Sequence, residues 1–354
     1  MRASLSLLLA LAVAARSATL IDGSEVIDLG SLGGTGLGGG AAAVNAAGQV
    51  VGSDFTAAGD EHAFLWQDGE MQDLGTLGGR RSRATGINRA AQVVGSAEIP
   101  SGDNHAFLWQ DASMQDLGTL GGPRSFAYAI NAAGQIVGIS ETASLDYHAF
   151  LWQDGTMLDL GTLSESPGGR LSQANAINDV GQVAGFSRNA AGLNHAVVWE
   201  NGTIRDLGVP DGFSQTFATG INNAGQVVAF SPVPGPGDGD VYHTILWQAD
   251  GTVSDLGTFG LKFGASPSGI NEAGQVVGFG RDERRQFHSY FWSPTDGMED
   301  LTAATGLEIA KAITGLMVAG SLTPLGPAAL VKLSFVPSPA TKRRADVHHV
   351  GAEL

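Results

Sequence analysis

The sequence contains no cysteine and few charged residues, which make up 15% of its 354 positions. Without thiols, neither a disulfide framework nor a thiolate zinc site can form. Acidic residues outnumber basic ones, and the net charge is −16. Such a charge argues against nucleic acid or an anionic membrane surface as the main partner.

Long apolar runs are also missing after the N-terminal segment, so no membrane span is predicted in the mature chain. The N-terminal segment has the pattern of an export signal: a basic Arg2, an apolar run over residues 5–15, and a small-x-small cleavage pattern at residues 12–14. We therefore expect residues 1–18 to be a bacterial-type secretory signal peptide, cut near residues 14–18. The mature protein is expected to be secreted, either extracellular or periplasmic.

The remainder of the chain repeats one unit with a period of 43–49 residues. An Asp-Leu pair marks each period, with the aspartate at Asp28, Asp73, Asp116, Asp159, Asp206, Asp255 and Asp300. All six tryptophans share one position of the unit: Trp66, Trp109, Trp152, Trp199, Trp247 and Trp292. Six of the eight histidines precede them by four residues: His62, His105, His148, His195, His243 and His288. Such placement of rare residues indicates a repeat architecture.

Each unit predicts four short β-strands. In the second unit they cover residues 84–88, 92–96, 105–110 and 114–118, separated by tight turns and one polar loop. The first turn begins at an asparagine that recurs in six units: Asn45, Asn88, Asn131, Asn178, Asn222 and Asn271. Four strands in this length match one blade of a β-propeller. No helical periodicity is evident outside the N-terminal segment.

The two ends of the array predict closure into a ring. A lone strand over residues 24–30 begins it, and a degenerate seventh unit ends it, with strands at 308–314, 316–321 and 328–335 but no fourth strand. The first strand can supply the missing one, which leaves no open sheet edge. We therefore predict an all-β fold, a single β-propeller over residues 22–335 with seven four-stranded blades, followed by a polar disordered tail over residues 336–354. Rings of six or eight blades and an open solenoid stay open as alternatives.

The repeated sequence resembles a known family. The run from His62 to Gly79, with the pattern His-Ala-Phe-Leu-Trp followed by Asp-Leu-Gly-Thr-Leu-Gly-Gly, and the run from Ala84 to Gly95 are similar to the HAF-repeat family of probable extracellular repeat proteins. The resemblance covers about residues 24–335. It implies an extracellular location and no defined activity.

The repeated polar residues have a structural explanation. Equivalent positions in different blades lie far apart, whereas a metal ion needs ligands ~2 Å away, so no metal or cofactor site is predicted from the histidines. We expect each histidine to hydrogen-bond a neighbouring loop or the repeated aspartate. The tryptophans are expected to pack between blades, with acceptors for their indole N–H groups. The aspartates are expected to cap the glycine turn that follows them.

The common motifs of enzyme chemistry are absent. There is no His-Glu-x-x-His, no phosphate-binding Gly-Lys-Ser/Thr loop and no Gly-x-Ser-x-Gly. Residues 34–39 satisfy Gly-x-Gly-x-x-Gly, but a strand is predicted after them where a dinucleotide site needs a helix. The loop at residues 235–240 offers two carboxylates, too few for calcium. No catalytic residue is predicted.

Long loops of variable sequence are predicted to share one face of the ring, the usual place for function on a constant scaffold. The blade-to-blade loops carry six cations, Arg80, Arg81, Arg83, Arg124, Arg170 and Lys262. Only two acids, Glu165 and Asp211, accompany them there. This patch predicts a monomeric binding or scaffold module for an acidic polysaccharide or an extracellular protein. Two alternatives stay open: the cations are simply solvated, or the protein is a secreted glycan hydrolase or lyase with carboxylates on a loop.

Overall fold

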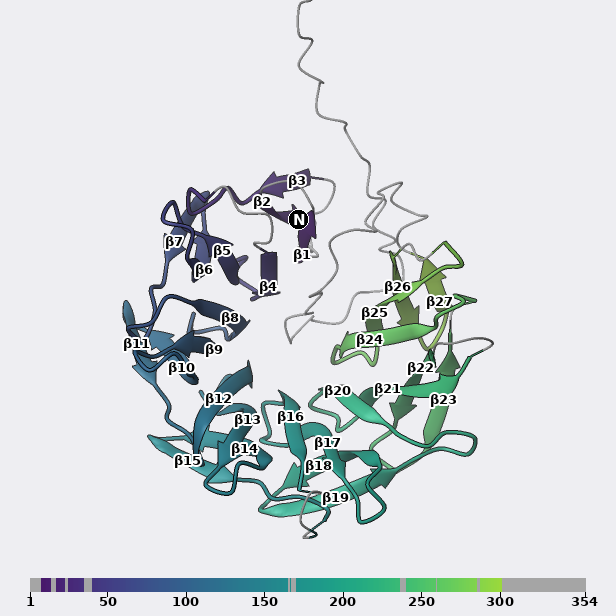
Figure 1. The fold of residues 1–354 in the computed structure, drawn as a ribbon. Helices are drawn as coiled ribbons and strands as arrows, with labels where there is room; N and C mark the ends of the chain where they lie inside the picture. The colour runs from purple at the N-terminus through teal and green to yellow at the C-terminus, as the bar shows by residue number, and fades with distance from the viewer. Residues whose placement is uncertain are drawn as a thin grey trace, which may run out of the picture.

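The computed structural model describes residues 8–13, 17–22, 25–34, 40–164, 166, 170–235, 240–258, 260–284 and 287–300. Every regular element among them is a β-strand. The described strands form six four-stranded antiparallel sheets and one three-stranded sheet, which Figure 1 shows arranged as a ring. The all-β, propeller-like fold predicted from the repeat is therefore confirmed.

Each four-stranded sheet is a meander whose first strand lies innermost and whose fourth lies outermost (Figure 1). The innermost strands are β4 (Gly40–Val44), β8 (Ser82–Ile87), β12 (Gly121–Ile130), β16 (Ser172–Ile177), β20 (Phe217–Ile221) and β24 (Ala265–Ile270). The second strands are β5 (Val50–Phe55), β9 (Val93–Glu98), β13 (Ile136–Thr142), β17 (Val183–Arg188), β21 (Val227–Pro234) and β25 (Val276–Arg281). The third strands are β6 (Glu61–Gln67), β10 (Asn104–Gln110), β14 (Tyr147–Gln153), β18 (Asn194–Glu200), β22 (Asp240–Trp247) and β26 (Phe287–Ser293). The outermost strands are β7 (Glu70–Asp73), β11 (Ser113–Asp116), β15 (Thr156–Asp159), β19 (Thr203–Gly208), β23 (Val253–Gly257) and β27 (Gly297–Asp300).

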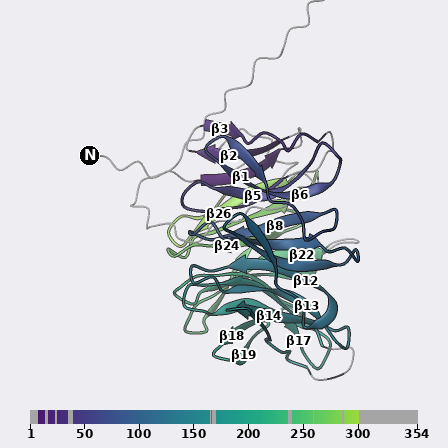
Figure 2. The ribbon, with the colours of Figure 1, turned by 90° about the vertical axis from the view of Figure 1, so that its left-hand side faces the viewer.

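The strands run along the axis of the ring, as the side view in Figure 2 shows. Their connections therefore gather on two opposite faces. The turns that follow the first and third strands of each blade form one face, here called the turn face. The longer loops that follow the second strand and that join one blade to the next form the other, here called the loop face.

The hydrophobic core lies between neighbouring blades. Trp109 of the second blade belongs to the same buried cluster as Ala43, Leu65 and Leu74 of the first, and Trp152 of the third shares a cluster with Leu108 of the second. The second and third strands supply fully buried side chains, whereas the outermost strands are mostly exposed. The expected interblade packing of the tryptophans is present, and each blade depends on its neighbour to cover its apolar face.

The N-terminal strands depart from the prediction. Strand β3 (Glu25–Asp28) does not supply a fourth strand to a last blade: it pairs with β2 (Ser17–Asp22), which pairs with β1 (Leu8–Val13). Two short hairpins close with far less loss of chain entropy than a contact with the far end of the sequence. Figure 1 shows this three-stranded sheet beside the first blade, with β1 toward the centre. The described part of the chain therefore has six four-stranded blades, and the prediction of seven is wrong for it; residues 301–354, with the strands predicted for the seventh unit and the tail, lie outside the described residues.

The recurring asparagine organises the first turn of each blade. In the third blade, the Asn131 Oδ1 atom accepts the backbone N–H groups of Ala133 and Gln135 at 3.1 and 2.9 Å. Gly134 completes the turn with a φ of 80°, a conformation that glycine adopts without steric cost. The asparagine side chain thus satisfies the backbone groups that the reversal of the chain leaves without a partner.

The other end of the same amide reaches the next blade. The Nδ2 atom of Asn131 donates to the backbone carbonyl of Asn178 at 3.0 Å, and both residues occupy the same turn position. The same bond joins five successive pairs of blades at 2.9–3.1 Å: Asn45 to Asn88, Asn88 to Asn131, Asn131 to Asn178, Asn178 to Asn222, and Asn222 to Asn271. We call this series the asparagine ladder. It fixes the inner edge of the turn face.

A second set of side chains joins the blades on the loop face. Ser125, which is fully buried, accepts the Ala106 N–H of the preceding blade at 2.8 Å and donates to the Gly118 carbonyl at 2.6 Å. Ser82, Ser172 and Thr216 make the equivalent pair of bonds. At the four junctions from the first to the fifth blade, both faces are therefore held by hydrogen bonds from buried polar side chains.

We predict that Asn131→Ala lowers the free energy of unfolding by about 1–3 kcal/mol, because it leaves buried backbone groups in two blades without partners. Chemical denaturation of the mature protein measures this. Asn104→Ala, at a half-buried asparagine outside the ladder, is the matched control and should cost less. Equal losses in the two variants would show that the ladder does not stabilise the ring.

Candidate functional site

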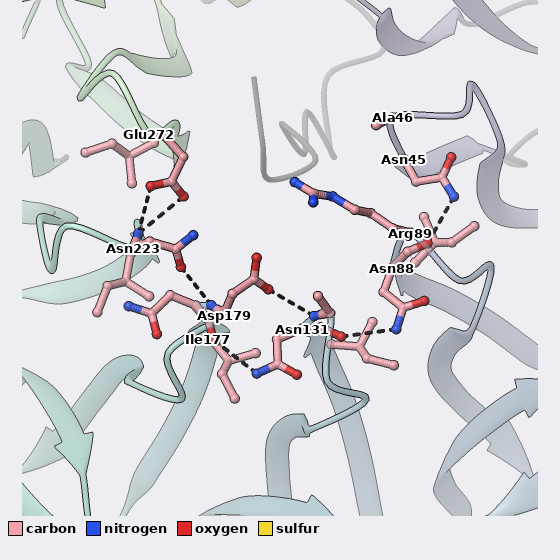
Figure 3. A pocket seen from close by; sticks show the side chains of 15 residues that line it. Asn45, Ala46, Asn88, Arg89, Asn131, Ile177, Asp179, Asn223 and Glu272 are labelled. Atoms are coloured by element: carbon pink, nitrogen blue, oxygen red, sulfur yellow. Dashed lines mark hydrogen bonds between the residues drawn. The ribbon is translucent and has the colours of Figure 1, made fainter. Parts of the chain in front are cut away.

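A pocket lies where the innermost strands of all six blades end on the turn face. Its wall is made by the last residue of those strands, such as Ile87, Ile130 and Ile177, and by the turns that follow. Its volume is about 120 Å³, which is smaller than the ~300–1,000 Å³ of sites that enclose a whole small ligand, so it has room for only part of one. We call it the central pocket (Figure 3).

The residue after each ladder asparagine lines this pocket and differs between blades, while the rest of the turn is nearly constant. In chain order these residues are Ala46, Arg89, Ala132, Asp179, Asn223 and Glu272. All of them are exposed. A constant backbone therefore presents a different set of chemical groups at each position around the pocket.

Three of these side chains also hydrogen-bond the preceding blade. The Asp179 carboxylate accepts the Ala132 N–H at 3.0 Å, and the Asn223 Oδ1 atom accepts the Asp179 N–H at 2.8 Å. The Glu272 carboxylate accepts the Asn223 N–H with both oxygens, at 3.1 and 3.2 Å. Figure 3 shows these bonds running along one side of the pocket. They hold the acceptors of the fourth to sixth blades in place.

Arg89 is the exception among the charged lining residues. Its side chain is exposed, and Figure 3 shows it extending toward the middle of the pocket. Among the described residues it has no hydrogen-bond acceptor and no ion-pair partner. Its guanidinium group therefore keeps five N–H donors available to a ligand.

The repeated histidines lie elsewhere, in the third strand of each blade. Every His Nδ1 atom donates to the repeated aspartate of its own blade at 2.8–3.0 Å: His62 to Asp73, His105 to Asp116, His148 to Asp159, His195 to Asp206, His243 to Asp255, and His288 to Asp300. Five of these aspartates also accept the N–H of the glycine two residues later, as Asp159 does from Gly161 at 2.8 Å. The aspartate joins the third and fourth strands and caps the turn after them.

Within the described ranges, no three His, Asp or Glu side chains gather in a way that could hold a metal ion. The same ranges contain no helix that is long and apolar enough to cross a membrane. The indole N–H groups of Trp66 and Trp199 are buried and find no acceptor among the described residues, although acceptors were expected.

The six cations predicted to bind a partner lie on the loop face, opposite the central pocket. Four of them face acids from the preceding blade: Arg80 with Asp60 at 2.7 Å, Arg83 with Glu61 at 2.6 Å, Arg124 with Asp103 at 3.6 Å, and Arg170 with Asp146 at 4.0 Å. Arg81 and Lys262 are exposed and form no ion pair with a described residue. These four acids cancel the positive excess that the sequence suggested. They lie in the loops between second and third strands or, for Glu61, at the start of the third strand, and they were not counted with the patch.

Sequence reasoning overlooked the central pocket because the turn face carries only short turns. A signal was nevertheless present. In a turn of nearly constant sequence, the residue after the asparagine changes between apolar, basic and acidic, as at Ala132, Arg89 and Asp179.

No protein-family model and no curated protein sequence matches this chain. Solved structures do resemble it. The acylaminoacyl peptidase of Pyrococcus horikoshii is 12% identical over 84% of this chain and 50% of its own, with a TM-score of 0.53. The β-propeller domain of the Trilobed protease from Pyrococcus furiosus is 10% identical over 85% of this chain and 97% of its own, with a TM-score of 0.49. BP39L lectin from Burkholderia pseudomallei is 11% identical over 71% of this chain and 79% of its own, with a TM-score of 0.44.

These likenesses concern the fold alone, since the identities are so low. The described fold is thus that of a β-propeller, as the likeness to the Pyrococcus horikoshii peptidase indicates. This chain spans half of that peptidase's length.

The His148–Asp159 pair makes stability depend on pH. Burial by itself raises the pKa of the Asp159 carboxyl, but hydrogen bonds from His148 and from the Gly161 amide outweigh it, so the pKa lies below its ordinary value. The carboxylate therefore adds stability above the unfolded-state pKa of ~3.9, and that stability is lost as the pH falls through the lower folded-state pKa.

We predict that Asp159→Asn weakens the dependence of unfolding free energy on pH below about pH 4, by at most about one proton. Denaturant titrations across this range measure the slope. Thr156→Ala, at an exposed residue of the same outermost strand that does not titrate, is the control and should keep the slope of the parent. A slope in Asp159→Asn equal to that of the parent protein contradicts the assignment.

Proposed function

We propose that the protein is a secreted binding module that holds part of an extracellular carbohydrate in the central pocket of the turn face. The observation that carries the proposal is the pocket itself. Six blades each contribute one turn to it, and the chemical groups at its rim vary on an otherwise repeated scaffold. Variable groups on a constant framework are the usual sign of a binding site.

The chemistry of the rim favours a sugar. Asp179 and Glu272 offer acceptors, Arg89 offers donors, and Asn223 offers both, while isoleucines line the wall. Sugar hydroxyl groups donate and accept at once, so they can satisfy such a mixed set, and the apolar face of the ring suits the aliphatic wall. A protein partner is the other outcome of the test below.

Export and the extracellular location rest on the N-terminal sequence and on the resemblance of the repeats to the HAF family. Both agree with a carbohydrate ligand outside the cell. The enzyme alternative has less support in the pocket. A glycan hydrolase needs two carboxylates facing each other across the bond to be cleaved, ~5–9.5 Å apart, whereas Asp179 and Glu272 are both engaged by backbone N–H groups of the preceding blade.

We predict that Ala132→Trp, which places a bulky ring at the rim, abolishes binding in a screen of immobilised glycans. The same substitution at Ala58, an exposed loop residue on the other face, is the matched control and should bind like the parent. Thermal melting shows that both variants are folded. Binding that survives at Ala132→Trp but is lost at Ala58→Trp places the site on the loop face. The release of shortened glycans by the parent supports the enzyme instead.

A further inference from the structure

We propose that the ligand of the central pocket carries a carboxylate, bound by Arg89 together with the backbone N–H groups of Ala46 and Arg89, so that the recognised sugar is a uronic acid. This inference rests on the proposed function and specifies its ligand. It follows from a difference between the blades: some backbone N–H groups of the rim have a side-chain acceptor and others have none.

From the third to the fifth blade, each rim N–H is accepted by the side chain that follows it around the ring. Ala132 donates to Asp179, Asp179 to Asn223, and Asn223 to Glu272. At the first two blades this series stops. By equivalence, the side chain that would accept the Ala46 N–H is Arg89, and the one that would accept the Arg89 N–H is Ala132; neither side chain contains an acceptor. Among the described residues these two N–H groups have no partner.

The first and second blades therefore present donors only, whereas the sixth blade, where the Glu272 N–H also has no acceptor among the described residues, carries a carboxylate as well. Two backbone N–H groups and the Arg89 guanidinium lie on adjacent turns of the same rim, and Figure 3 shows the guanidinium extending toward the middle of the pocket. Backbone N–H groups without an acceptor, together with a planar guanidinium fork, suit a carboxylate or a similar oxyanion.

The opposite part of the rim decides which oxyanion fits. Asp179 and Glu272 add two negative charges to the same pocket, so a doubly charged phosphate is repelled more strongly than a singly charged carboxylate. Their remaining acceptor capacity suits hydroxyl donors. A carboxylate on a ring with several hydroxyl groups, which is a uronic acid, satisfies both parts of the rim at once.

The test measures the affinity of the mature protein for a galacturonate trimer and for the neutral galactose trimer by calorimetry. The parent is expected to bind the acidic trimer at least ~10-fold more tightly, the size of effect expected of a hydrogen-bonded charge. Arg89→Ala should lose this preference and keep the weaker neutral binding. Arg89→Lys should recover part of the preference, because a point charge lacks the guanidinium fork. Arg80→Ala, whose side chain pairs with Asp60 on the loop face, is the control and should bind like the parent.

Different results distinguish the inference from the proposed function. The carboxylate assignment is overturned if the parent binds the two trimers equally, or if the preference for the acidic trimer survives Arg89→Ala. Either result leaves the proposed function standing, because Ala132→Trp tests glycan binding in the central pocket separately. Tighter binding of a sulfated galactose trimer overturns it in favour of a sulfate ester. Tighter binding of a short peptide with a free carboxyl terminus overturns the sugar. If the parent binds none of these trimers or the peptide, the carboxylate assignment is overturned. The proposed function is removed as well only if the parent binds no glycan at all in the screen of immobilised glycans.

Discussion

The ring depends on one hydrogen bond, the donation from a turn asparagine to the backbone carbonyl of the same asparagine in the next blade. Its other side-chain atom holds the turn of its own blade. One residue therefore sets both the local chain reversal and the spacing between blades. Because each amide is buried and fully used, removing it leaves unpaired groups on both sides of the junction.

This arrangement separates the roles of neighbouring residues. The asparagine maintains the framework, so the residue that follows it is free to change without altering the ring. Arg89, Asp179 and Glu272 occupy this freed position in different blades. The His–Asp pairs hold the outer two strands of each blade together in the same way. On the loop face, ion pairs such as Arg80 with Asp60 and Arg170 with Asp146 join neighbouring blades. A repeat that looks uniform in sequence thus provides a pocket with a different group on almost every side.

Much of the fold could be predicted because its period is local. The four strands of a unit, the packing role of Trp109 and the capping role of Asp159 all follow from residues close together in sequence. The number of blades could not be predicted. The sequence does not show whether β3 pairs with the adjacent β2 or with a strand at the far end of the chain. The charge of the loop face was misjudged for a similar reason: Arg83 and Glu61 belong to different blades. The cross-blade bond of Asn131 joins residues 47 positions apart, and no pattern within one unit reveals it.

The central claim is that ligand binds on the turn face, at the rim formed by the residues after the ladder asparagines. Hydrogen–deuterium exchange of the mature protein, with and without a saturating galacturonate oligosaccharide, tests it most directly. The account predicts slower exchange of the backbone amides at the turns that begin with Asn45 and Asn88, because the N–H groups of Ala46 and Arg89 acquire an acceptor. It predicts unchanged exchange in the loop-face segments around Asp60 and Arg80. Protection confined to those loop-face segments would contradict it.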